Sequence, residues 1–82
     1  MNVNEVVIGI LIEISGLEQI NSDDNLQDDL ALDSLAMVTL LILIEEKLSI
    51  ELDETDMNPM DLLTVSDVVN MATRYVLDEK ES

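Results

Sequence analysis

The sequence predicts an all-α protein, a small four-helix bundle with a long first loop and a short third helix. Apolar residues recur at helical spacing in three long stretches. The chain holds one proline and two glycines, too few for a turn-rich β fold. Hydrophobic residues make up 48% of the 82 residues, enough for an aliphatic core. We expect a single domain over residues 1–82, ordered over about 3–77, with a polar tail at 78–82.

The chain is strongly acidic, with a formal net charge of −16. Nucleic acid and anionic membrane surfaces repel such a chain, so we expect partners with basic patches. Cysteine and histidine are absent, which removes most nucleophile–base pairs and the usual zinc sites. We therefore expect neither an enzyme nor a metal site. The apolar stretches are too short to span a bilayer and no basic residue precedes the first, so we expect a cytoplasmic monomer without membrane insertion.

The first helix is predicted over about residues 3–14. Asn2 is suited to the N-cap, with Glu5 as a capping-box partner, and Gly16 to the left-handed position after the helix. Gly9 either lets a neighbouring helix approach closely or has no structural role. The predicted buried face consists of Val3, Val6, Val7, Ile10 and Ile14, widened by Ile8, Leu11 and Ile12.

A long loop is predicted from Leu17 to Asp33, because turn formers and acids replace the helical pattern. It lacks the central glycine and the terminal glutamate of a calcium-binding EF-hand loop, so we expect no specific calcium site. Apolar residues within the loop are expected to pin it to the core: Leu17, Ile20, Leu26, Leu30 and Leu32.

The second helix is predicted from Ser34 to about Leu48, with Asp33 as its N-cap. This places the Ser34 hydroxyl at a helix N-terminus, where unpaired N–H groups and the helix dipole favour a phosphate. A serine there can carry a phosphodiester. The predicted core face consists of Met37, Leu40, Leu41, Ile44 and Leu48.

A second apolar face runs along the same helix. It contains Leu35, Val38 and Ile42, with Thr39 beside them. A helix that is apolar nearly all round is either wrapped by other helices or binds a partner with its extra face. We favour partner recognition because this face begins at Ser34, and burial is the alternative.

The remaining chain is predicted to hold two more helices. Residues 49–57 read as an extended connection with Ile50 and Leu52 turned inward. A short helix is expected to begin at Asn58-Pro59 and to include Met60, Leu62 and Leu63. The last helix opens with Thr64 and Asp67 as a capping box, and the hydroxyl of Tyr75 needs water or a partner. Its predicted core face consists of Val65, Val68, Val69, Ala72 and Val76.

Asp33-Ser34-Leu35, preceded by Leu30 and Leu32 and followed by an amphipathic helix, resembles the prosthetic-group site of the acyl carrier proteins. The resemblance covers nearly the whole chain. It is strengthened by the position of this motif, the four-helix pattern around it, the length of the chain and its acidity. It implies that a separate transferase uses coenzyme A to attach 4′-phosphopantetheine to Ser34. The thiol of this arm would then hold an acyl or aminoacyl group as a thioester.

The resemblance also implies roles for neighbouring residues and for partners. Asp33 would cap the helix and help to hold the metal ion during transfer, and Leu35, Val38, Thr39 and Ile42 would contact partner enzymes. The implied partners are the phosphopantetheinyl transferase, a loading ligase, and acyltransferase or synthase enzymes with basic or apolar docking patches. A gap between the helices would shelter an apolar cargo.

One departure bears on the cargo. Carriers of fatty-acid synthesis usually place acids just after the Ser-Leu pair and one turn later, where this chain has Ala36 and Thr39. That pattern is closer to aminoacyl or peptidyl carriers, including D-alanyl carriers, and to carriers of specialised pathways. The alternative is an acidic helical adaptor without a prosthetic group, in which Ser34 is only a neighbour of the N-cap. The sequence indicates neither the cargo, the pathway nor the loading enzyme.

Overall fold

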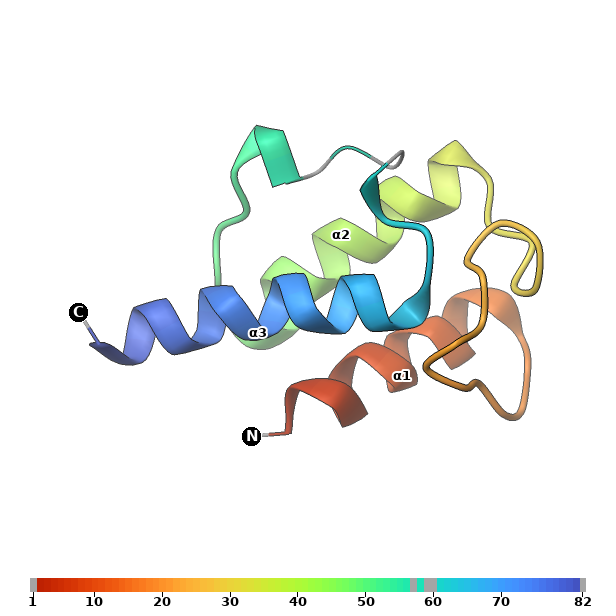
Figure 1. Ribbon diagram of the computed structural model, residues 1–82, viewed down its shortest axis with the longest axis horizontal. Coiled ribbons are helices and arrows are strands. Elements are labelled where there is room, and N and C mark those ends of the chain that lie inside the picture. The colour runs from red at the N-terminus through yellow and green to blue at the C-terminus, as the bar shows by residue number, and fades with distance from the viewer. Residues whose placement is uncertain (1, 57, 59–60, 82) are drawn as a thin grey trace.

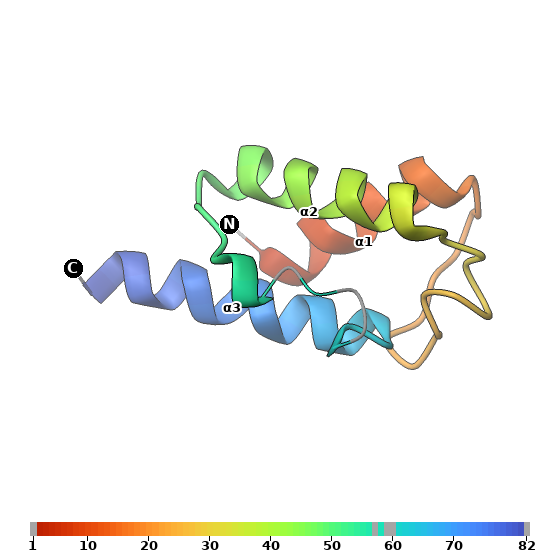
Figure 2. The same cartoon turned by 90° about the horizontal axis from the view of Figure 1, so that it is seen from above.

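The computed structural model describes residues 2–56, 58 and 61–81, and this part of the chain is all-helical. It contains α1 (Val3–Ser15), α2 (Ser34–Leu48), the 3-10 helix η1 (Glu54–Asp56) and α3 (Val65–Glu81). Helix α1 packs against both α2 and α3 (Figure 1), and Figure 2 shows the same arrangement from above. Over the described residues, no helix is both long and apolar enough to cross a membrane. The all-α prediction is confirmed.

The number of helices differs from the predicted four-helix bundle. The described residues form three α-helices and the single-turn 3-10 helix η1, and Asp61 also has 3-10 conformation, with its N–H donating to the Asn58 carbonyl at 3.1 Å. The predicted short helix from Asn58 to Leu63 includes residues 59 and 60, which lie outside the described residues. Of its described members, Leu62 is buried and Leu63 is exposed.

Both ends of α1 follow from the capping residues. The Asn2 side-chain oxygen accepts a hydrogen bond from the Glu5 N–H at 3.2 Å, so Asn2 is the N-cap. Gly16 has a φ of 75° and donates its N–H to the Ile12 carbonyl at 2.9 Å. The predicted start and stop of this helix are confirmed.

The core is entirely aliphatic apart from methionine. The predicted core face of α2 is buried at all five positions. In α3 the prediction missed Met71, which is buried, whereas Val69 and Val76 are only partly buried. The buried side chains are Val7, Ile10, Leu11, Ile20, Leu26, Leu30, Leu32, Met37, Leu40, Leu41, Ile44, Leu48, Ile50, Leu52, Leu62, Val65, Val68, Met71 and Ala72.

The loop between α1 and α2 is pinned by four of its five predicted anchors, Ile20, Leu26, Leu30 and Leu32. The prediction for Leu17 is wrong, since this side chain is 39% exposed. The left-handed turn at Gly16 takes the chain out of α1 directly before it, so Leu17 no longer follows the buried face of the helix.

Backbone hydrogen bonds join this loop to the start of α3. The Leu26 N–H donates to the Leu63 carbonyl at 2.9 Å, and the N–H groups of Val65 and Ser66 donate to loop carbonyls at 3.1 and 3.0 Å. The Asp67 carboxylate accepts from the N–H groups of Leu63 and Thr64, which confirms the capping box. Loop and cap together satisfy first-turn donors that a helix cannot pair by itself.

The connection after α2 departs from the predicted extended segment. Ile50 and Leu52 are buried, as expected, but Glu54–Asp56 forms η1. Asp53 explains the turn: its carboxylate accepts from the Thr55 N–H and hydroxyl, and its carbonyl accepts from the Asp56 N–H at 2.9 Å. Aspartate favours such local turns because its short side chain reaches the backbone two residues on.

Helix α3 runs to Glu81, beyond the expected start of a polar tail at residue 78. Residues 77–81 contain neither glycine nor proline, and glutamate, lysine and leucine are good helix formers. The polar composition of residues 78–82 therefore does not predict where this helix ends.

The two glycines of the chain should respond in opposite directions to alanine. A Cβ added at Gly9 meets nothing within 4 Å, so Gly9→Ala should raise the free energy of unfolding by about 1 kcal/mol. Gly16 also has open space but a φ of 75°, so Gly16→Ala should lower this free energy by about 1 kcal/mol. Urea denaturation of the two variants beside the wild type measures both effects. A loss of stability in Gly9→Ala would show that this position needs glycine.

Candidate functional site

The residues before α2 are held by buried leucines on both sides of a left-handed residue. Leu30 and Leu32 are buried, and Ala31 between them has a φ of 56° and is exposed. The Leu32 N–H donates to the Leu26 carbonyl at 3.0 Å. The left-handed residue lets both leucines point inward, so the chain arrives at Asp33 in a defined direction.

Asn25 organises the loop further upstream. Its side-chain oxygen accepts from the N–H groups of Gln27 and Asp28, both at 2.9 Å. Its own N–H donates to the Asp29 carboxylate at 2.7 Å. Some of the acidic and amide side chains of this loop therefore bond to its own backbone, which makes the approach to α2 a built structure rather than a free linker.

Asp33 caps α2 and places Ser34 in solvent. The Asp33 Oδ1 atom accepts from the Ala36 N–H at 2.8 Å, and the Asp33 carbonyl accepts from the Met37 N–H at 2.9 Å. Ser34 is the first residue of the helix and is exposed. Helix geometry leaves the N–H groups of Ser34 and Leu35 without carbonyl partners, so this end favours an anionic group. The predicted helix start and the exposure of Ser34 agree with the structure.

The second apolar face of α2 is open to solvent. Leu35, Val38 and Ile42 are 75%, 45% and 47% exposed, and Thr39 is exposed beside them. The Thr39 hydroxyl donates to the Leu35 carbonyl at 3.0 Å, which satisfies it within the helix. The helices that the structure describes do not bury this face, which was the alternative considered for it. We call these four residues the outer face of α2.

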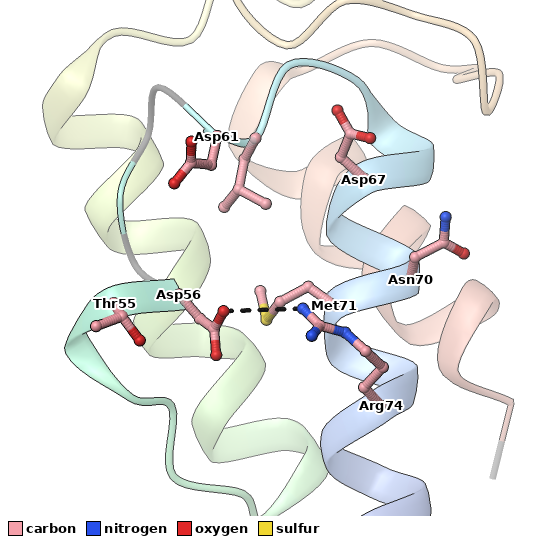
Figure 3. Close-up of a pocket in the computed structure, with 8 residues that line it drawn as sticks. Thr55, Asp56, Asp61, Asp67, Asn70, Met71 and Arg74 are labelled. Carbon is pink, nitrogen blue, oxygen red and sulfur yellow. Dashed lines mark ion pairs between the residues drawn. The ribbon is translucent and has the colours of Figure 1, made fainter.

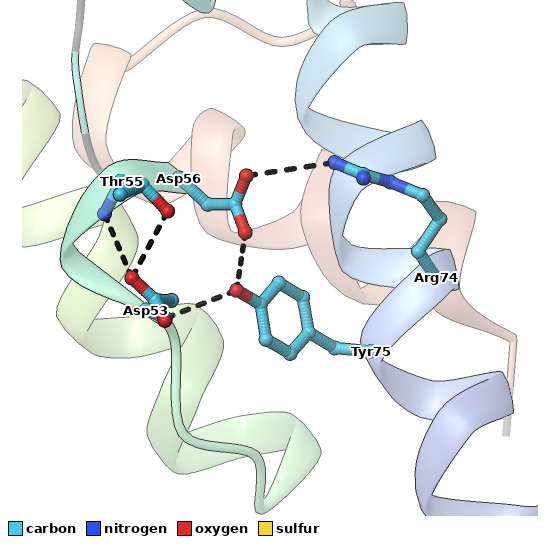
Figure 4. Close-up of polar contacts among 5 residues, drawn as sticks. All are labelled: Asp53, Thr55, Asp56, Arg74 and Tyr75. Atoms are coloured by element: carbon cyan, nitrogen blue, oxygen red, sulfur yellow. Dashed lines mark hydrogen bonds and ion pairs between the residues drawn. The ribbon is translucent and has the colours of Figure 1, made fainter.

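A second polar feature lies away from Ser34, between η1 and α3. The Tyr75 hydroxyl accepts from the Asp53 N–H at 3.0 Å and donates to the Asp56 carboxylate, which also lies 3.8 Å from Arg74 (Figure 4). The hydrogen bond to Asp56 raises the pKa of Tyr75, so its hydroxyl keeps the proton that it donates. Hydrogen bonds from Thr55 hold the pKa of Asp53 below its ordinary value.

A cavity of about 230 Å³ lies beside these contacts. Figure 3 shows Asp56 and Asp61 on one side, with Asp67, Asn70 and Arg74 of α3 opposite. Its walls are mixed, because Leu62 and Met71 line the cavity together with these polar side chains.

Sequence reasoning located the exposed serine and the outer face but missed the contacts of Tyr75. The need of its hydroxyl for a partner was foreseen, yet the partners lie 19 and 22 residues away in the chain. Only the packing of η1 on α3 brings them together. Leu63, a member of the predicted short helix, is 54% exposed.

The N-cap of α2 can be tested by two substitutions at one position. Asp33→Ala removes the acceptor of the Ala36 N–H and should lower the free energy of unfolding by about 1 kcal/mol. Asp33→Asn keeps a side-chain oxygen and should stay within about 0.5 kcal/mol of the wild type. Urea denaturation followed by circular dichroism gives both values. Equal stabilities of Asp33→Ala and the wild type would show that the cap contributes nothing.

Comparison with known proteins shows which family shares this fold and this helix start. A crystal structure of an acyl carrier protein from Thermotoga maritima superimposes with a TM-score of 0.77, covering 95% of this chain and 94% of that chain at 16% identity, which shows a shared fold. A D-alanyl carrier protein of Enterococcus faecalis is 41% identical over 58 residues, which cover 68% of this chain and 74% of the relative. The model of the phosphopantetheine attachment site family matches residues 5–72, a range that includes the loop and all of α2. The chain therefore belongs to the phosphopantetheine attachment family of carrier proteins.

Proposed function

We propose that Ser34 is the residue that bears 4′-phosphopantetheine and that this chain presents small aminoacyl or acyl groups to partner enzymes. The observation that carries the assignment is the exposed hydroxyl at the first residue of α2, at the end of a loop fixed by its own hydrogen bonds. Ser34 also lies within the residues that match the family.

The residues around Ser34 fit a phosphodiester. The helix end offers the N–H groups of Ser34 and Leu35, and exposure leaves room for an arm to leave the surface. Asp33 uses Oδ1 for the cap, so the rest of its carboxylate is free to help hold a divalent cation during transfer. These are the two roles proposed for Asp33.

Attachment consumes the Ser34 hydroxyl and coenzyme A. The Ser34 oxygen bonds to the phosphorus on the pantetheine side of the pyrophosphate, and the pyrophosphate bond breaks. Adenosine 3′,5′-bisphosphate leaves, and the hydroxyl proton passes to a base of the transferase or to water. When bound, the group supplies a thiol that holds cargo as a thioester, which this cysteine-free chain cannot do with its own side chains. We propose that the chain itself is not an enzyme.

The cargo proposed is a small aminoacyl group. The relative that is 41% identical is a D-alanyl carrier protein. The first turns of α2 hold Ala36 and Thr39 instead of the acids typical of fatty-acid carriers, and no charged residue occurs between Ser34 and Ile44. A loading ligase and an acyltransferase, acting in the cytoplasm, would be the partners that follow from such a cargo.

Attachment can be tested by intact mass. The purified chain, incubated with coenzyme A, magnesium and a broad-specificity phosphopantetheinyl transferase, should gain the mass of one phosphopantetheine group. Ser34→Ala should gain nothing, and Ser49→Ala, which removes another exposed serine at the far end of α2, should be modified like the wild type. An unmodified wild-type chain would favour the acidic adaptor, and modification of Ser34→Ala would place the site elsewhere.

The outer face of α2 is the proposed docking surface, and charge should disrupt it. Val38→Glu and Ile42→Glu each put a carboxylate into an apolar contact, which should slow modification by the transferase at least about tenfold. Leu77→Glu is the matched control, because Leu77 is 55% exposed but lies on α3. All three variants should keep the helical circular-dichroism signal. If the control slowed as much as the two α2 variants, added negative charge alone would explain the effect.

A further inference from the structure

The connection between α2 and η1 is held from two helices at once. The Leu52 N–H donates to the Glu45 carboxylate of α2 at 2.9 Å, and the next N–H, that of Asp53, donates to the Tyr75 hydroxyl of α3 at 3.0 Å. Two successive backbone donors therefore reach acceptors on different helices. In Figure 1 this connection rises from the end of α2 and passes above α3.

Tyr75 ties the same connection a second time. Its hydroxyl donates to the Asp56 carboxylate in η1, and Arg74 lies 3.8 Å from the other oxygen of that carboxylate. Figure 4 shows the Tyr75 ring reaching from α3 to both aspartates. We call Glu45, Asp53, Asp56, Arg74 and Tyr75 the polar clamp.

Apolar packing holds this segment at only two points. Ile50 and Leu52 are buried, whereas no residue of η1 is buried. Helix α1 packs against both α2 and α3, and the connection bridges α2 and α3 on another side. The polar clamp therefore adds specific contacts between this connection and both helices on this side of the aliphatic core.

We propose that the polar clamp, through Tyr75, excludes alkyl chains from the space between α2 and α3, so that this carrier holds short acyl or aminoacyl cargo outside its core. The proposal rests on the proposed function, because it needs an arm on Ser34. It departs from the sheltered apolar cargo that the family resemblance implies. Tyr75 acts here as a specificity-determining residue that touches the connection and not the reacting atoms.

Entry of an alkyl chain under this connection would be opposed twice. The chain would have to displace the connection and leave the N–H groups of Leu52 and Asp53 without their present acceptors. In the cavity beside η1 it would also take water away from the carboxylates of Asp56, Asp61 and Asp67, which line that cavity together with Leu62 and Met71. A short or charged cargo has little apolar surface to bury between α2 and α3, so it stays outside the core.

The test loads the full chain with acetyl-phosphopantetheine or octanoyl-phosphopantetheine from the matching acyl-coenzyme A and follows thioester cleavage by hydroxylamine. Each rate is divided by that of the same acyl-coenzyme A free in solution. For the wild type, both normalised rates should agree within about twofold, because neither chain is sheltered. Tyr75→Phe keeps the ring and removes the hydroxyl with both of its hydrogen bonds. It should slow cleavage of the octanoyl thioester by at least about fivefold, the effect expected for the loss of one hydrogen bond.

Thr73→Val is the matched control, because it removes a hydroxyl of α3 that bonds only within the helix, to the Val69 carbonyl at 2.7 Å. It should behave like the wild type. Faster hydrogen exchange of the Asp53 amide in Tyr75→Phe, with unchanged circular dichroism, should accompany the octanoyl effect. Protection of the octanoyl thioester in the wild type, or an unchanged ratio in Tyr75→Phe, would overturn the proposal. Failure of the wild type to accept either arm would instead overturn the proposed function.

Discussion

The geometry of the candidate site depends on the cap that Asp33 places on α2. The bond from the Ala36 N–H to the Asp33 carboxylate fixes the first helical residue, and Leu32, buried directly before the cap, fixes the direction from which the chain enters. Ser34 follows the cap directly, and its side chain is exposed. The Ser34 side chain is therefore exposed because Asp33 before it caps the helix and Leu32 before Asp33 is buried in the core.

The cap of α2 is coupled to the start of α3 through the loop. Leu26 is the link: its carbonyl accepts from the Leu32 N–H just before the cap, and its N–H donates to the Leu63 carbonyl just before α3. The first turn of α3 is satisfied in turn by carbonyls of the same loop. The two helix starts thus share one set of backbone hydrogen bonds, and a disturbance of the loop would weaken both ends together. This coupling holds a loop of polar residues in one arrangement before the proposed modification site.

Much of this arrangement could be predicted because it depends on local patterns. The core face of α2, the cap residues Asn2, Asp33 and Thr64, and the left-handed Gly16 are all properties of short stretches of sequence. The left-handed Ala31 could not be predicted, since alanine avoids that conformation and only the burial of both neighbouring leucines imposes it. Prediction failed for the contacts of Tyr75 for a different reason, because they join segments that become neighbours only in the folded chain.

The distribution of charge separates two tasks within this small protein. A net charge of −16 attracts basic partners over distances of about a Debye length, roughly 10 Å at moderate ionic strength, and so raises the rate of encounter. The outer face of α2 contributes no charge to that field, so a partner that docks there, as proposed, would make an apolar contact whose lifetime depends on burial. Arg74, one of three basic residues, is already paired with Asp56 in the polar clamp. Attraction therefore depends on acids spread over the whole chain, including those of the polar clamp, whereas the proposed docking depends on the uncharged outer face of α2.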